Sequence, residues 1–115
     1  MIRRLRLAWP QPAVPGSPPN RPIRLLAVSD ERAAALDHPA NRAVLAPLDA
    51  VLGCGDLDPD YLAFLGDAFR APLLYVRGNH DRGAAWSAGQ DHLPHEMDGG
   101  IARVADVRLV GLSWP

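Results

Sequence analysis

Residues 50–56 read Ala-Val-Leu-Gly-Cys-Gly-Asp, and residues 72–81 read Pro-Leu-Leu-Tyr-Val-Arg-Gly-Asn-His-Asp. Each stretch is a short apolar run that ends in glycine followed by polar residues. Apolar runs without polar alternation are typical of strands that are buried on both faces of a parallel sheet. We therefore predict strands at residues 49–53 and 72–76, each with a polar loop at its carboxyl end.

A third apolar run, residues 23–28, precedes these two and predicts the first strand. Weaker helical patterns at residues 31–36 and 42–48 connect it to the second strand. Strands that alternate with helices in this way form parallel sheets with right-handed crossovers. The sequence therefore predicts an α/β fold that begins with a strand-helix-strand-helix-strand unit.

The clearest helix signal lies between the second and third strands. Asp58 is placed to cap a helix, and Pro59 suits the first helical position because it needs no backbone donor there. Apolar side chains then recur at helical spacing from Tyr61 to Phe69. We predict a helix that begins after Asp58 and covers one face of the sheet.

The two ends of the chain differ from this central pattern. Residues 10–22 contain six prolines, each of which fixes φ and lacks a backbone donor. We interpret residues 1–22 as a flexible or extended Pro-rich tail and residues 23–115 as the domain. Near the other end, residues 101–104 and 107–112 are apolar runs separated by Ala105-Asp106, which predicts a β-hairpin.

Composition excludes some classes of protein. The 115 residues suffice for one small domain, and the formal net charge of −1 gives no signal for binding nucleic acid or an anionic membrane. No run of eighteen apolar residues occurs, so we expect no membrane span. A single cysteine, Cys54, rules out an internal disulfide and fits a reducing compartment. These features predict a cytoplasmic protein.

Polar residues follow each predicted strand at the same edge of the sheet. Asp30 follows the first strand, Asp56 the second, and Asn79 and His80 the third. Ligands of open parallel sheets bind outside the carboxyl ends of the strands. Carboxylate, amide oxygen and imidazole are the groups that hard and borderline divalent metals prefer. The sequence therefore predicts a metal site at this edge.

The sequence context of these residues resembles a known family. Gly55-Asp56 after one strand and Gly78-Asn79-His80-Asp81 after the next resemble motifs of the calcineurin-like metallophosphoesterases, and the resemblance covers residues 23 to about 112. It implies the N-terminal βαβαβ half of the family's α/β sandwich, followed by a hairpin that starts the second sheet. It also implies two divalent ions, commonly manganese, iron, zinc or nickel, and the hydrolysis of phosphate mono- or diesters as substrates.

The resemblance assigns a role to each residue. Asp30 matches a ligand of the first metal, Asp56 the carboxylate that bridges both metals, and Asn79 a ligand of the second metal. His80 matches the catalytic histidine that contacts the substrate phosphate and can protonate the leaving group. Asp81 either caps a helix or supports a neighbouring ligand, and the sequence leaves both readings open.

The chain also departs from the family pattern. Arg32 stands where the family has a metal-binding histidine, and a guanidinium cannot ligate a metal. Pro59 stands where the family has the aspartate that orients the catalytic histidine. Glu31, or a part of the domain that this chain lacks, could supply the metal ligand missing at Arg32. Asp58 or Asp60 could replace the aspartate expected at Pro59. The late Gly-His-x-His motif does not occur after His80, so we interpret the chain as truncated.

Two alternative functions follow from these departures. The first is a degenerate, non-catalytic module of the same fold that binds metal or phosphate. The second treats Asp56-Leu57-Asp58 as the nucleophile loop of a haloacid-dehalogenase-like phosphatase, in which the first aspartate attacks phosphorus. The second alternative leaves residues 78–81 unexplained, and the chain contains no threonine for that mechanism.

Overall fold

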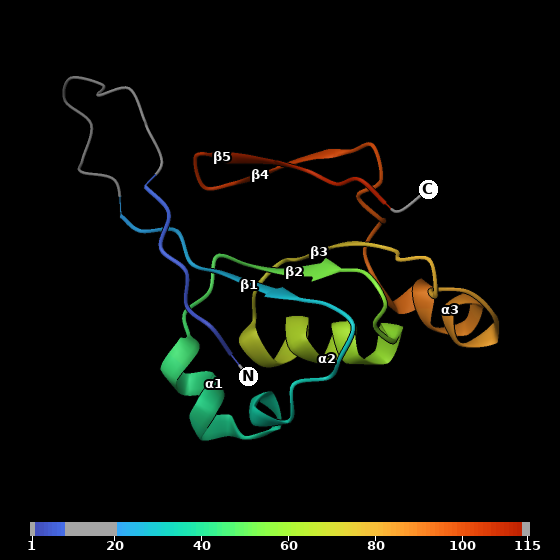
Figure 1. Ribbon diagram of the computed structural model, residues 1–115, viewed down its shortest axis with the longest axis horizontal. Helices are drawn as coiled ribbons and strands as arrows, with labels where there is room; N and C mark the ends of the chain where they lie inside the picture. The colour runs from blue at the N-terminus through green and yellow to red at the C-terminus, as the bar shows by residue number, and fades with distance from the viewer. Residues whose placement is uncertain (1, 9–20, 114–115) are drawn as a thin grey trace.

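The computed structural model describes residues 2–8 and 21–113. Its central part alternates strands and helices, and its last two strands follow a segment of short helices (Figure 1). In chain order the elements are β1 (Leu25–Val28), the 3-10 helix η1 (Ala34–Asp37), α1 (Pro39–Leu45), β2 (Ala50–Cys54), α2 (Pro59–Phe69), β3 (Leu73–Val76), α3 (Ala84–Gly89), the 3-10 helix η2 (Gln90–His92), β4 (Ile101–Val104) and β5 (Val107–Val110).

The first three strands form a parallel sheet in the order β1-β2-β3. This confirms the predicted α/β class with its parallel strands interleaved with helices. The first strand begins two residues later than predicted, at Leu25. Arg24, which precedes it, accepts a hydrogen bond at its carbonyl oxygen from the Asp49 backbone N–H at 2.8 Å. Its backbone N–H donates to Asp49 Oδ2 at 2.8 Å.

The predicted helix after β2 is confirmed as α2. Asp58 occupies the N-cap position, but its side chain makes no capping hydrogen bond. At the other end, Arg70 takes a left-handed conformation with φ of 51°. Its N–H donates to Asp67 O, and Ala71 N–H donates to Gly66 O, which together form a Schellman cap.

The two helices between β1 and β2 form at positions other than those predicted. Residues 31–36 were predicted to be helical, yet only the single 3-10 turn η1 forms there. The predicted helix at 42–48 lies earlier, at 39–45, where Pro39 occupies its first turn. It ends before Pro47, because a proline disfavours the helical conformation of the residue that precedes it. Ala46 accordingly has ψ of 156°.

The hydrophobic core lies between α2 and one face of the parallel sheet (Figure 1). Gly53 of β2 permits this close packing, because a Cβ there would lie 2.9 Å from both Leu62 and Tyr75. Burial of these apolar side chains is the main force that holds α2 against the sheet. The buried members are Val28, Leu36, Val51, Leu57, Tyr61, Leu62, Leu65, Phe69, Leu73, Tyr75 and Trp86.

The predicted hairpin is confirmed by antiparallel pairing of β4 with β5. It lies on the side of the parallel sheet opposite α2 (Figure 1). The second strand ends at Val110, two residues before the predicted end, and Ala105 in the turn has φ of 51°. The cross-strand neighbours Ile101 and Val110 are both exposed.

The N-terminal prediction concerns residues that are only partly described. Residues 2–8 and 21–22 form neither helix nor strand, and residues 9–20, which include most of the Pro-rich stretch, lie outside the described residues. Across residues 2–8 and 21–113, the helices are too short or too polar to cross a membrane.

Candidate functional site

The loops that follow β2 and β3 touch each other through two glycines. Gly55 has φ of 101°, and a Cβ on it would lie 3.1 Å from the Gly78 Cα. A Cβ on Gly78 would collide with the Asp56 carboxylate. Only glycine allows two backbones to approach this closely. The contact sets the Asp56 carboxylate directly against the Gly78 loop.

Asp81 ties these two loops together from below the surface. Its side chain is buried, with 5% of the residue exposed. Oδ2 accepts hydrogen bonds from the backbone N–H groups of Asp56 at 2.8 Å and Gly78 at 2.7 Å, and Oδ1 accepts one from Trp86 Nε1 at 3.1 Å. Asp81 therefore supports the loops and does not cap α3, whose N-cap is Gly83.

Asp56 holds His80 by two contacts. The His80 backbone N–H donates to Asp56 Oδ1 at 3.0 Å, and His80 Nδ1 lies 3.3 Å from Asp56 Oδ2. The bond from the backbone N–H, followed by the one from the side chain, lowers the pKa of Asp56 below its ordinary value. The His80 side chain is 78% exposed, and its Nδ1 faces Asp56.

Asp30 and Asp56 share an unusual backbone conformation. Each lies two residues after the end of a strand, and their φ angles are 65° and 59°. Left-handed conformations outside glycine cost on the order of 1 kcal/mol and are concentrated at functional sites. The Asp30 N–H donates to Gly55 O at 3.1 Å, so the loop after β1 is joined to the loop after β2. The structure thus brings the two predicted carboxylate positions to neighbouring strand ends.

Arg32 belongs to the packing of α2. Its guanidinium carbon lies 4.8 Å from the centre of the Tyr61 ring and 5.9 Å from that of Phe64. Its Nη2 bonds to Asp37 Oδ1 at 3.3 Å. Arg77 is also structural, because it stacks on Trp86 and donates to the Asp81 carbonyl. Both arginines therefore have structural partners.

The ligand set for a metal is partial. Across the described residues, no group of three or more His, Cys, Asp or Glu side chains is placed to hold a metal ion. Asp30 and Asp56 supply two carboxylates, and Asn79, which is exposed in the Gly78 loop, adds an amide oxygen. Two carboxylates and an amide suit a hard divalent cation that keeps several waters. The chemistry of the residues present fits such an ion.

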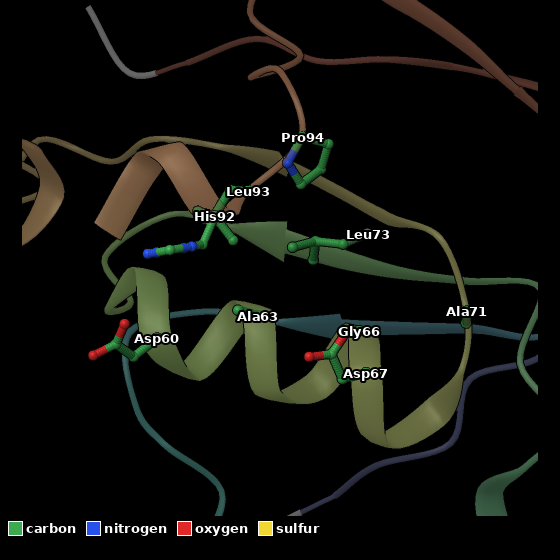
Figure 2. Close-up of a pocket in the computed structure, with 9 residues that line it drawn as sticks. All are labelled: Asp60, Ala63, Gly66, Asp67, Ala71, Leu73, His92, Leu93 and Pro94. Atoms are coloured by element: carbon green, nitrogen blue, oxygen red, sulfur yellow. The ribbon is translucent and has the colours of Figure 1, made fainter. Parts of the chain in front are cut away.

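A groove with no predicted site residue runs along α2 (Figure 2). It has a volume of about 580 Å³ and is bounded by α2, Leu73 and residues 92–94. Asp60, Asp67 and His92 supply its ionisable groups, and Figure 2 shows the two carboxylates a full turn or more apart along the helix. In the part of the chain that the structure describes, neither these three residues nor the strand-end residues form a group of three His, Cys, Asp or Glu side chains that could hold a metal.

Sequence reasoning missed the partnership of Asp81 with Trp86. Two roles were left open for Asp81, and no role was predicted for Trp86. The available signal was the spacing, because Trp86 lies five residues after Asp81 and is the one aromatic residue of α3. A buried carboxylate needs several donors, and an indole N–H is one of the few that an apolar core can supply.

Comparison with known proteins leaves the family open. Neither a protein-family model, nor a curated protein, nor a solved structure matches the chain.

Proposed function

We propose that the chain carries the N-terminal part of the active site of a metal-dependent phosphoesterase. The main observation in support is that Asp30 and Asp56, at neighbouring strand ends, both have a left-handed backbone conformation. The hydrogen bond from Asp30 N–H to Gly55 O joins their loops, and Asp56 holds an exposed histidine. Such an edge is where open parallel sheets bind their ligands. The specific calcineurin-like architecture, with the hairpin as the start of a second sheet, is part of this proposal.

Three residues would hold the divalent metal. Asp30 and Asp56 would supply carboxylate oxygens and Asn79 an amide oxygen, the donor types that hard cations prefer. When bound, divalent ions polarise the phosphoryl oxygens and lower the pKa of bound water. Two such ions are expected from the family resemblance, with manganese, iron, zinc and nickel as candidates.

The remaining roles belong to the chain's own side chains. Asp56 faces His80 Nδ1 and thereby orients the ring, as carboxylates commonly do for catalytic histidines. With that nitrogen engaged, Nε2 of His80 can donate a proton to the leaving oxygen of the ester. Asp81 holds the two loops in register by accepting from Asp56 N–H and Gly78 N–H. Buried support of this kind is what keeps reacting groups in position.

The experiment is hydrolysis of p-nitrophenyl phosphate and bis(p-nitrophenyl) phosphate with added Mn²⁺, Zn²⁺ or Ni²⁺. We expect metal-dependent turnover that falls at least a hundredfold in Asp56→Asn. Asn tolerates the left-handed conformation, so this variant should still fold. Asp58→Asn is the matched control, because Asp58 is exposed and its side chain makes no cap bond. Equal loss in both variants would contradict the proposal.

A non-catalytic binding module is the second candidate. The observation that favours it is the placement of Arg32, which packs on Tyr61 and Phe64 where a metal-binding histidine was expected. Such a module would bind Mn²⁺ with a dependence on Asp56 and would release no nitrophenol. The same two variants, titrated with metal and assayed for turnover, separate an enzyme from a binder.

A further inference from the structure

The groove along α2 has acidic side chains on one wall and apolar ones on the other. Figure 2 shows Asp60 and Asp67 on α2, with Leu93 and Pro94 across the groove. The two aspartates are seven residues apart, so they lie about 10 Å apart along the helix axis. Both are exposed, as is Pro94, and Leu93 is half-buried. The groove therefore offers a charged wall and an apolar wall to a partner.

The two carboxylates of the groove have no cation to neutralise them in the described part of the chain. Among residues 2–8 and 21–113, neither Asp60 nor Asp67 has a basic side chain within ion-pair distance. Asp67 also lies in the last turn of α2, where the helix dipole disfavours a negative charge. Both carboxylates are therefore available to cations from outside the chain.

A segment of complementary character lies at residues 2–8, which read Ile-Arg-Arg-Leu-Arg-Leu-Ala. Leu5 and Leu7 are 78% and 76% exposed. Within the described residues, no acid lies within ion-pair distance of the arginines beside them. In an extended chain, Arg4 and Arg6 point to one side and the two leucines to the other. Such a segment suits a groove with carboxylates on one wall and apolar groups on the other.

The segment and the groove of one chain lie at opposite edges of the parallel sheet. Residues 4–7 lie beside residues 22–25 at the start of β1, whereas the groove is bounded by Leu73 at the start of β3 (Figure 1). We propose that the groove binds residues 2–8 of a second copy of the chain. The arginines face the α2 carboxylates, and the leucines face the opposite wall. The strand-end residues take no part, so this inference is independent of the proposed function.

Charge reversal followed by mixing tests this contact, with self-association of the whole chain measured by sedimentation velocity. The groove variant carries Asp60→Lys and Asp67→Lys, and the segment variant carries Arg4→Glu and Arg6→Glu. Each variant alone brings like charges together, so we expect association at least about tenfold weaker than in the native chain. An equimolar mixture should recover association, because each segment then meets a groove of opposite charge. Asp106→Lys, in the exposed hairpin turn, is the control and should associate as the native chain does.

The outcomes decide the inference in either direction. A native chain that stays monomeric at millimolar concentration overturns it, even if a synthetic peptide of residues 2–8 binds the groove. Unchanged association in either reversed variant overturns it as well, and so does a mixture that stays as weak as its components. Recovery in the mixture supports it. If urea unfolding shows that the double groove variant is unfolded, Asp67→Lys alone takes its place, because a cation suits the last turn of a helix.

Discussion

The loops after β2 and β3 are built differently from the loop after β1. The first two are joined by the Gly55–Gly78 contact and by the buried Asp81, which accepts three hydrogen bonds. The loop after β1 is joined to its neighbours by the Asp30 N–H bond to Gly55 O and the Ala33 N–H bond to the Tyr61 hydroxyl. Buried, fully bonded networks are more rigid than exposed loops.

This difference indicates which half of the candidate site is preorganised. The Asp56 backbone is bonded to the buried Asp81, and its carboxylate bonds to the His80 backbone, whereas Asp30 lies in an exposed loop. A site with one rigid and one adaptable half would lose most of its affinity when the rigid half is disturbed. The variants that follow test this contrast, beginning with the largest expected effect.

Removal of the buried carboxylate should be the most damaging change. Asp81→Ala leaves the N–H groups of Asp56, Gly78 and Trp86 without their acceptor in a part of the structure that water reaches poorly. We expect the free energy of unfolding to fall by about 3 kcal/mol, measured by urea denaturation. Asp91→Ala, at an exposed position of η2, should change it by less than about 0.5 kcal/mol. Similar losses in both variants would contradict the network.

The glycine contact should come second. Gly78→Ala places a Cβ against the Asp56 carboxylate, which must then move. We expect a loss of about 2 kcal/mol in the free energy of unfolding, together with weaker Mn²⁺ binding. Gly66→Ala is the opposite control, because a Cβ there meets Leu73 at an ordinary 3.5 Å within α2. It should stabilise the protein by about 0.5–1 kcal/mol. A Gly78→Ala protein with unchanged stability and metal affinity would refute the close approach.

A third variant tests whether the left-handed residue Ala105, unlike Asp30 and Asp56, affects stability alone. Ala105 adopts φ of 51° in the hairpin turn. Its methyl group strains the backbone there and cannot act as a metal ligand. Ala105→Gly should raise the free energy of unfolding by about 1 kcal/mol and leave Mn²⁺ affinity unchanged. Thermal and urea unfolding, with a metal titration, check both parts. A loss of stability would mean that this turn is not strained.

The smallest effect is expected at the opposite end of the strands. Hydrogen bonds from the Arg21 side chain and then from the Arg24 backbone N–H lower the pKa of Asp49. Because the folded pKa lies below the unfolded value of about 3.9, this stabilisation is present above that pH and is lost as pH falls through the folded pKa. The stability difference between the native chain and Asp49→Asn should therefore shrink below about pH 4.

Urea unfolding between pH 6 and pH 3 measures this difference, and Arg21→Gln serves as the partner variant. Arg21 is largely exposed, with 67% of its side chain accessible, so the effect should be small. Neither variant should alter Mn²⁺ affinity, because the pair lies at the start of β1 and β2. A difference that stays constant with pH would contradict the assigned ion pair.

Much of the architecture could be predicted from local patterns. The apolar runs located β2 and β3 to within a residue or two, and Pro59 with the spacing of Tyr61 to Phe69 located α2. The linker between β1 and β2 could not be placed, because Pro39 and Pro47 constrain it more than its weak helical pattern does. Over such short lengths, the positions of the prolines decide where a helix begins and ends more than weak helix propensity does.

The site could be predicted only as a set of strand-end residues. Their common edge follows from parallel pairing, and the neighbouring positions of Asp30 and Asp56 bear this out. The role of Asp81 and the packing of Arg32 on Tyr61 depend on long-range contacts, at sequence separations that local patterns do not encode. Both the role of Asp81 and the position of Arg32 follow from tertiary packing.

The most direct test of the central claim is to locate the metal by NMR. Mn²⁺ is titrated into the ¹⁵N-labelled chain, and paramagnetic broadening is read for each amide. We predict broadening that begins at the amides of Asp30, Asp56, Asn79 and His80, and that disappears in Asp56→Asn. Broadening that begins instead at Asp60 and Asp67 of the α2 groove, or that has no preferred location, would contradict a metal site at the strand ends.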